Sequence, residues 1–289
     1  MNLAGSAIVL SDASALQATL TASADSTIVS AGALQVAGSV TGSARLALTS
    51  ASSTVFGALS VGGALSLTSP GAVTQLAATA LKVGGVTTVA AEGQAVTLAN
   101  TANDFGGLVT VNAASVSVRD TNALNAALTA GSSSSVVAGG ALSVTGKISQ
   151  GDLTLGSGGL ASIGALEVAG ALALTSTGAV SQTGDLLIGG AASVAASGQS
   201  VSLVREGNRF GGAVTVAGAA ISLRDSDALS LSLAASGSTT VTAAGALSVS
   251  GATSGATSGQ PKKPDVLPVD TAPKKSAEPK KAEIGRAHV

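Results

Sequence analysis

A block of about 105 residues occurs twice in this 289-residue chain, and this duplication constrains the fold more than any other feature. The series from Gly93 to Leu124 returns from Gly198 to Leu229 at a constant shift of 105 residues. Upstream of it, the segments 71–75 and 178–182 match at a shift of 107, so a two-residue insertion or deletion separates the two regions. Internal repetition at this length predicts an elongated stack of similar units rather than a globule around one central pocket.

The closing segment of the block occurs three times, beginning at Ala33, Ala141 and Ala246. A partial copy therefore stands at the start of the chain. The repeat region, residues 1–251, divides into the following units: a partial unit 1–42, then 43–146 and 147–251.

The apolar residues are of the kind that fills a narrow, regular interior. Hydrophobic residues make up 45% of the chain, yet it has three Phe and no Tyr or Trp, so Ala, Val, Leu and Ile supply most of this content. Charged residues are only 10%, which argues against a disordered polyelectrolyte. The absence of Cys excludes disulfides, thiol catalysis and cysteine metal sites. No stretch is long and apolar enough for a transmembrane helix.

Short alternating triplets, apolar–small–apolar, dominate the local pattern and are separated by Gly and Ala. They include Leu34-Gln-Val36, Leu65-Ser-Leu67, Val96-Thr-Leu98, Val109-Thr-Val111, Leu142-Ser-Val144, Val201-Ser-Leu203 and Val214-Thr-Val216. Period-two alternation with β-branched residues predicts strands, and strands this short need neighbours. Two or three of them per coil of roughly 20 residues, stacked about 4.8 Å apart, predict about 12 coils over residues 1–251. The predicted fold is all-β, a parallel β-helix solenoid.

Two other all-β architectures fit less well. A transmembrane β-barrel needs strands of about 9–11 residues and aromatic girdles, which this composition cannot supply. A β-sandwich accounts for closely spaced strands but not for the long internal copy.

After residue 251 the composition changes. Residues 252–283 begin with a Gly/Ser/Thr-rich stretch and continue as a Pro/Lys-rich segment that holds five of the six prolines, and they predict a disordered, solvated tail. Residues 284–289 resemble the translation of a sequencing-adapter oligonucleotide and are interpreted as an artefact, together with the only His of the chain.

Two motifs recur in the long units, and both are interpreted as structural. Asn103-Asp-Phe105-Gly-Gly returns as Asn208-Arg-Phe210-Gly-Gly, for which we expect a turn with Asn and Gly in left-handed conformations and a Phe in the core. The charge at the second position reverses between the copies, which argues against a charge-dependent site. Arg-Asp pairs recur at residues 119–120 and 224–225, where we expect Asp to cap a turn and Arg to face solvent.

The sequence offers no group of residues suited to catalysis, so the chain is predicted not to be an enzyme, with no catalytic residue, no metal site and no cofactor. The acidic side chains are scattered without the close pairing that general acid–base chemistry needs. The repeat region is mildly acidic and lacks stacking aromatics, so no nucleic-acid partner is expected. Threonine pairs such as Thr19-Leu-Thr21 and Thr240-Val-Thr242 do not recur at the spacing of coils, which argues against an ice-binding threonine ladder.

The series from Gly178 through Asn208-Arg-Phe-Gly-Gly to Leu229 resembles the repeat region of large filamentous-haemagglutinin-like adhesins of Gram-negative bacteria. The resemblance covers essentially all of residues 1–251 and implies a right-handed β-helix exported by two-partner secretion or an autotransporter-type route. The implied location is secreted or on the outer face of the cell, and the implied partners are host-cell, bacterial or matrix components and an outer-membrane secretion partner. The signal peptide and secretion domain of that family are not found in this sequence, so we do not expect this chain to direct its own export.

Two functions are consistent with these observations. The first is a non-catalytic shaft segment of an adhesin, which mediates or displays cell attachment and biofilm contact. The alternative is a structural matrix or surface-layer protein whose repeats associate with one another.

Overall fold

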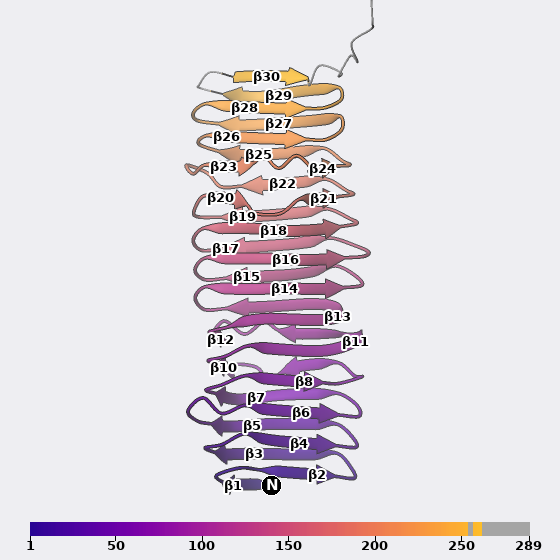
Figure 1. The fold of residues 1–289 in the computed structure, drawn as a ribbon, viewed down its shortest axis with the longest axis vertical. Coiled ribbons are helices and arrows are strands. Elements are labelled where there is room, and N and C mark those ends of the chain that lie inside the picture. Colours follow the sequence, from indigo (N-terminus) through magenta and orange to yellow (C-terminus); the bar gives the residue numbers. More distant parts are fainter. Residues whose placement is uncertain (254–256, 262–289) are drawn as a thin grey trace, which may run out of the picture.

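The computed structural model describes residues 1–253 and 257–261 of the chain. Every regular element in these residues is a β-strand, and all of their strand pairings are parallel. The strands wind into a solenoid of about 13 turns, so the predicted all-β parallel solenoid is confirmed (Figure 1). None of the described residues forms a helix that could cross a membrane.

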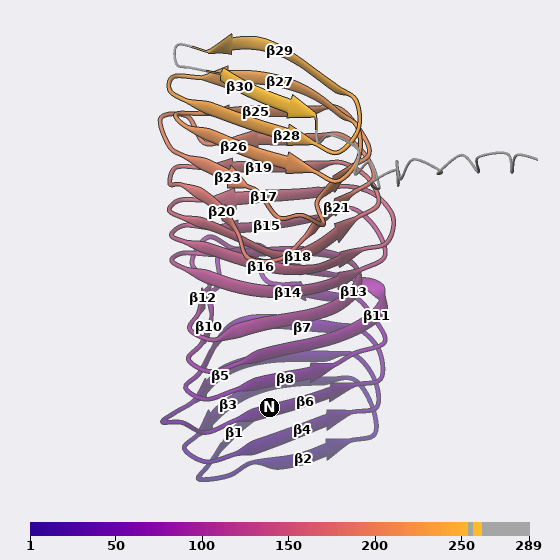
Figure 2. The ribbon, with the colours of Figure 1, turned by 45° about the horizontal axis from the view of Figure 1, so that its top comes forward.

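Each turn of the solenoid has two halves, and each half adds strands to one of two parallel sheets that face each other across the core. We call these sheets face 1 and face 2 (Figure 2). Face 1 consists of β1 (Asn2–Gly5), β3 (Leu16–Ala22), β5 (Leu34–Val40), β7 (Thr54–Val61), β9 (Val73–Gln75), β10 (Leu81–Val83), β12 (Asp104–Phe105), β15 (Ser134–Ala138), β17 (Leu153–Ser157), β19 (Leu172–Ser176), β22 (Ala192–Ala195), β25 (Val214–Gly218), β27 (Leu229–Ala235) and β29 (Leu247–Thr253). Face 2 consists of β2 (Val9–Asp12), β4 (Ser26–Ser30), β6 (Leu46–Ser50), β8 (Leu65–Thr68), β14 (Leu124–Ala130), β16 (Leu142–Ile148), β18 (Ala161–Val168), β20 (Val180–Gln182), β21 (Leu186–Ile188), β23 (Val201–Leu203), β24 (Arg209–Phe210), β26 (Ile221–Asp225), β28 (Thr239–Ala243) and β30 (Thr257–Pro261).

Two long strands turn a corner and belong to both faces. β11 (Thr87–Leu98) and β13 (Leu108–Asp120) pair on face 2 through their first halves, where Val89 lies opposite Val111, and on face 1 through their second halves, where Val96 lies opposite Val116. The register shifts between Ala91 and Ala95, which is the corner itself.

The core is the column of inward-facing aliphatic side chains that runs along the rod. In β3 the burial alternates strictly, with Leu16, Ala18 and Leu20 buried and the residues between them exposed. Each fully buried Leu, Val or Ile side chain contributes about 1.5–3 kcal/mol relative to an exposed one. Phe105 and Phe210 are buried at 1% and 3% exposure, which confirms that the motif phenylalanines lie in the core.

Buried serines tie successive corners together. Ser50 Oγ donates to the Gly32 carbonyl of the preceding coil at 3.0 Å, and Ser176 Oγ donates to the Gly159 carbonyl at 2.8 Å. The serines that make such bonds are Ser30, Ser50, Ser69, Ser157 and Ser176. Each of these buried hydroxyls adds a hydrogen bond at a corner carbonyl, and several of these carbonyls, such as that of Gly159, also accept a backbone N–H from the next coil.

Glycines stand where stacked corners come closest. A Cβ on Gly106 would lie 2.8 Å from the Gly84 carbonyl oxygen, and a Cβ on Gly84 would lie 2.5 Å from that of Gly62. Gly38 has a φ of 112°, and a Cβ there would lie 2.1 Å from the Leu20 carbonyl oxygen. The glycine punctuation of the sequence is therefore required by the stacking of the coils.

The long repeat is not a whole number of turns. β3 and its copy β14 lie on opposite faces, and so do β14 and its next copy β27. From β3 to β14 the chain makes eleven half-turns. The first five are β4, β5, β6, β7 and β8, and the sixth is β9 together with β10. The others are the first half of β11, the second half of β11 together with β12, the first half of β13, the second half of β13, and β14. Each repeat is thus five and a half turns, and equivalent residues of successive repeats face opposite sides of the rod.

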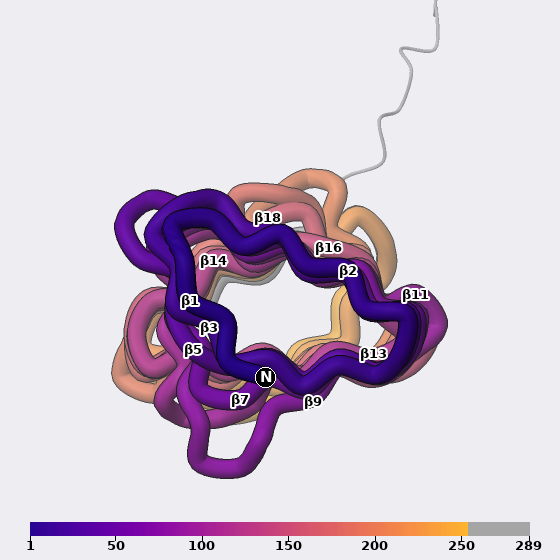
Figure 3. Tube along the Cα trace, turned by 90° about the horizontal axis from the view of Figure 1, so that it is seen from below, coloured from indigo at the N-terminus to yellow at the C-terminus, as the bar shows by residue number. Residues whose placement is uncertain are grey.

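The two-residue length difference between the copies lies in one loop. Five residues, 76–80, separate Gln75 from Leu81, whereas three residues, 183–185, separate Gln182 from Leu186. Seen along the rod, loops project from the oval cross-section without interrupting the stack (Figure 3).

At the C-terminal end, β29 continues to Thr253 and pairs with β27, and β30 pairs with β28. The strands thus extend past the domain boundary that the sequence suggested at residue 251. The remainder of the predicted disordered segment, and the hexapeptide 284–289, lie outside the described residues.

Candidate functional site

Each complete copy of the repeat places a buried polar cluster where one half-turn widens. In the first copy, a loop of residues 76–80 interrupts the half-turn between β9 and β10. In the next coil, a loop of residues 99–103 interrupts the corresponding half-turn between β11 and β12. Asn103 ends the second loop with 0% of its side chain exposed. A fully buried amide needs partners for all its polar atoms, and the two loops provide them.

Asn103 and Gln75 form a reciprocal amide pair across the two coils. Gln75 Nε2 donates to Asn103 Oδ1 at 2.6 Å, and Asn103 Nδ2 donates back to Gln75 Oε1 at 3.1 Å. The remaining capacity of Asn103 is used by the Leu81 backbone N–H, at 2.9 Å from Oδ1, and by the Leu98 carbonyl, at 2.9 Å from Nδ2. One side chain therefore joins β9, β10 and β11, and we call this arrangement the amide clamp.

The second copy repeats the amide clamp on the opposite face. Gln182 Nε2 donates to Asn208 Oδ1, and Asn208 Nδ2 donates back to Gln182 Oε1 at 3.0 Å. The Leu186 N–H lies 3.0 Å from Asn208 Oδ1, and the Leu203 carbonyl lies 3.2 Å from Nδ2. The clamp persists although the loop beside it is two residues shorter, so it belongs to the repeat rather than to one loop.

A buried aspartate lies one coil further along. Asp120 is 1% exposed; its Oδ1 accepts from the Asn122 N–H at 2.8 Å and its Oδ2 accepts from the Phe105 N–H at 2.9 Å. The first bond is the predicted turn cap, which is confirmed, and the second ties this corner to the preceding coil. Asp225 makes the equivalent pair of bonds.

Burial sets the ionisation of both carboxyl groups. Desolvation raises the pKa of Asp120 above the ordinary value of aspartate, even though the N–H groups of Asn122 and Phe105 oppose this shift. The pKa of Asp225 is raised for the same reason. In the partial copy, the equivalent Asp12 lies in the first turn of the described solenoid, and hydrogen bonds from Ser14 lower its pKa. The same sequence position therefore changes its acidity with its place in the stack.

The prediction that Asn and Gly of the motif take left-handed conformations is wrong. Among the described residues, positive φ angles occur at Gly93 and Gly198 upstream of the motif and at other sites, but not at Asn103 or at the glycines that follow Phe105. Asn is needed here for its side-chain amide, and the two glycines are needed because the coils approach too closely for a Cβ.

The charge reversal between the copies is compensated by its contact partner. In the first copy, Asn122 Nδ2 donates to Asp104 Oδ1 at 3.1 Å. In the second, Arg209 replaces Asp104, and its Nε lies 2.8 Å from Oδ2 of Asp227, which replaces Asn122. The two positions stay in contact, but a hydrogen bond in the first copy is replaced by an ion pair in the second. The ion-paired side chains are more than half exposed, so the pair contributes at most about 1 kcal/mol to stability.

The two arginines of the Arg-Asp motif lie at the surface, as predicted. Arg119 is exposed, and Arg224 is partly exposed and forms an ion pair with Glu206 at 2.9 Å. Sequence reasoning missed the amide clamp, because Gln75 and Asn103 lie 28 residues apart. The recurrence of both residues in the second copy was the available signal.

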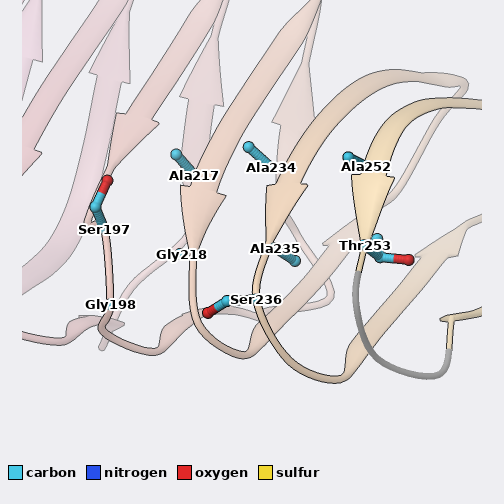
Figure 4. A pocket seen from close by; sticks show the side chains of 9 residues that line it. All are labelled: Ser197, Gly198, Ala217, Gly218, Ala234, Ala235, Ser236, Ala252 and Thr253. Carbon is cyan, nitrogen blue, oxygen red and sulfur yellow. The ribbon is translucent and has the colours of Figure 1, made fainter.

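These groups provide packing and turn-making chemistry. Both amides and both aspartates use their polar atoms on neighbouring backbone and on one another. Within the described residues, no group of three or more His, Cys, Asp or Glu side chains is placed to hold a metal ion. A surface hollow of about 500 Å³ near the C-terminal coils is lined by Ser197, Gly198, Ala217, Gly218, Ala234, Ala235, Ser236, Ala252 and Thr253, which offer only hydroxyl, methyl and backbone groups (Figure 4).

Comparison with known proteins agrees with this structural reading. Residues 42–112 and 150–217 match a family described as repeats of unknown function (DUF5649). Searches of curated proteins and of solved structures gave no match. Both matched stretches contain the amide clamp and the Phe-Gly-Gly sequence, and both end in the strand after it. The chain is a repetitive β-solenoid protein.

Loss of the amide clamp should loosen its coils. We expect Asn103→Ala to lower stability by about 3 kcal/mol, because it removes the bonds to the Leu81 N–H, the Leu98 carbonyl and Gln75 Oε1, and leaves Gln75 Nε2 only its bond to the Thr79 carbonyl. The exposed Asn125→Ala should change stability by less than about 0.5 kcal/mol. Urea unfolding followed by circular dichroism measures both, and equal effects of the two substitutions would contradict the role of the clamp.

The buried aspartates should make stability depend on pH in an unusual direction. A carboxyl group whose pKa is raised by folding binds more protons in the folded state than in the unfolded state. Its stabilising contribution to the free energy of unfolding is fully present below its pKa in the unfolded chain, about 3.9, and is lost as the pH rises through its pKa in the folded protein. For either single variant, Asp120→Asn or Asp225→Asn, we expect the stability difference from the wild type to shift in favour of the variant as pH rises from about 4. Urea midpoints across this range test it, with the exposed Glu92→Gln as the matched loss of one charge, and a constant difference would refute it.

Proposed function

We propose that this chain is a non-catalytic shaft segment of a secreted or surface-exposed bacterial adhesin, which holds an attachment module away from the cell. One observation carries the proposal: the two copies keep the groups that build the rod and exchange the groups that a binding site would use. The clamp, the capping aspartates, Phe105 with its copy Phe210, and the close-approach glycines recur, while Asp104 becomes Arg209 and Asn122 becomes Asp227.

The resemblance to filamentous-haemagglutinin-like repeats supports the location and the partners of this shaft. On this proposal the full-length protein crosses the outer membrane with a secretion partner, and its receptors are host-cell, bacterial or matrix components. A parallel solenoid suits a shaft because each repeat adds the same length and contacts only its neighbours.

A shaft works by holding its two ends at a fixed distance, which requires every coil to be attached firmly to the next. Every coil is held to the next by a parallel backbone ladder and by inward aliphatic side chains, and at five corners buried serines add further bonds. Bending or separating the coils would expose this core and break several hydrogen bonds at once, so the rod transmits position from one end to the other.

Removing one repeat should shorten the rod without unfolding it. Deletion of residues 124–228 joins Ala123 to Leu229, which reproduces the Ala-Leu junction present at both sites. Five and a half turns at about 4.8 Å each predict a rod shorter by about 26 Å. Small-angle scattering of the full chain and the deletion variant measures this difference.

The function is tested by placing the chain between an outer-membrane anchor and a known binding module. We expect attachment through the module to fall when residues 124–228 are deleted, and we expect the chain without the module to bind no cells. Attachment that is independent of the repeat number, or saturable cell binding by the chain alone, would contradict the shaft role.

A further inference from the structure

Two long surfaces of the solenoid carry no charged side chain. The first lies on face 1 and is formed by β15, β17, β19, β22, β25, β27 and β29; we call it the upper neutral face. The second lies on face 2 and is formed by β4, β6, β8, the first halves of β11 and β13, and β14; we call it the lower neutral face. Each is the copy of the other in the long repeat.

The outward side chains of these surfaces form two parallel rows. On the upper neutral face, one row is made mostly of hydroxyl residues that lie opposite one another in successive coils: Ser135, Thr154, Ala173, Ser193, Thr215, Ser232 and Ser250. The row beside it is small: Val137, Gly156, Thr175, Ala195, Ala217, Ala234 and Ala252. Hydroxyl residues thus do stack in register, although threonine pairs do not recur in the sequence, because neighbours in the row are separated by anything from 17 to 22 residues.

The lower neutral face has the same composition. Its rows are Thr27, Ala47, Ser66, Thr88, Thr110 and Ala127, and beside them Val29, Thr49, Thr68, Ala90, Asn112 and Thr129. The half-integer repeat places the two surfaces on opposite sides of the rod and displaces them along it by five and a half turns.

Charged side chains lie outside these surfaces on the same two sides. On face 1, Arg119 lies opposite Val137 at the margin of the upper neutral face, and Asp104 and Lys82 precede it along the rod. These three residues separate the upper neutral face from a shorter uncharged stretch formed by β1, β3, β5, β7 and β9. On face 2, Lys147 forms an ion pair with Glu167 at 2.8 Å just beyond the lower neutral face, and Arg209 follows. Neutral and charged stretches therefore alternate on each side.

We propose that copies of this chain associate side by side through their neutral faces. A sheet surface of Ser, Thr, Ala and Gly lets a second sheet approach closely without immobilising long side chains. Burying the upper neutral face desolvates no charge, and the lower one meets a charge only at its edge, where the Glu92 carboxylate accepts a hydrogen bond from Asn112 Nδ2 at 2.9 Å. With strands about 4.8 Å apart and about 17 Å long, the seven strands of the upper neutral face present about 570 Å² and the six of the lower one about 490 Å². Counting both partners, each interface buries roughly 1,000–1,100 Å², which is at the lower limit for a specific interface.

The position of the two faces determines how far the association extends. A rod with one such surface would stop at a dimer, whereas a rod with two on opposite sides can bind a copy on each side and continue. The inferred assembly is a lateral array of parallel or antiparallel rods. This inference adds to the shaft role and does not depend on it.

The experiment uses the full chain and matched lysine pairs at equivalent positions of the two surfaces. Ser193→Lys/Thr215→Lys blocks the upper neutral face and Thr88→Lys/Thr110→Lys blocks the lower one. Ser202→Lys/Ser222→Lys introduces the same charges on face 2, outside both surfaces, and is the control. Sedimentation velocity over a range of concentrations gives the size of the assemblies, and circular dichroism verifies that each variant keeps its β signal.

We expect wild type and control to form assemblies that grow with concentration, either one-sided variant to form species no larger than a dimer, and the four-lysine variant to be monomeric. A wild type that stays monomeric at every concentration would overturn the proposal. So would assemblies that persist undiminished in the four-lysine variant, because these would arise from the strand edges at the ends of the rod or from another surface.

Discussion

The structure depends on one interaction, the parallel backbone hydrogen-bond ladder between successive coils. No strand here is long enough to be stable alone, and each coil finds partners for its N–H and C=O groups only in the coils before and after it. Whatever keeps the coils at this spacing is therefore preserved in both copies. Glycines remove the Cβ atoms that would separate the corners, serines bind the corner carbonyls, and the amide clamp holds together the two coils that widen.

A repeat of five and a half turns has a consequence for the surface that a repeat of whole turns would not have. With whole turns, every copy of a side chain would lie on one side of the rod. With the extra half-turn, successive copies alternate, so the molecule presents similar surfaces in two opposite directions. The interior is unaffected because both faces offer the same inward column of Val, Leu and Ala.

Much of this architecture could be predicted from the sequence, and the reasons for the misses are physical. Triplets such as Leu65-Ser-Leu67 identify strands because alternation reports directly on which side chains face the core. The cap at Asp120 was predictable because it is local, spanning two residues. The amide clamp was not, since Gln75 and Asn103 meet only after the chain has completed a coil, and neither was the half-turn, since coils of unequal length leave no fixed period in the sequence.

The central claim is that neighbours in the stack, rather than neighbours in the sequence, share a face. Because the chain has no native Cys, pairs of introduced cysteines test it directly. Ser193 and Thr215 lie opposite each other in adjacent coils of face 1, whereas Ser202, between them in sequence, lies on face 2. Under mild oxidation, Ser193→Cys/Thr215→Cys should form an intramolecular disulfide, because adjacent parallel strands bring the two Cα atoms within the range that a disulfide bridges. Ser202→Cys/Thr215→Cys should remain reduced within one molecule, and a disulfide in this second pair but not in the first would contradict the account.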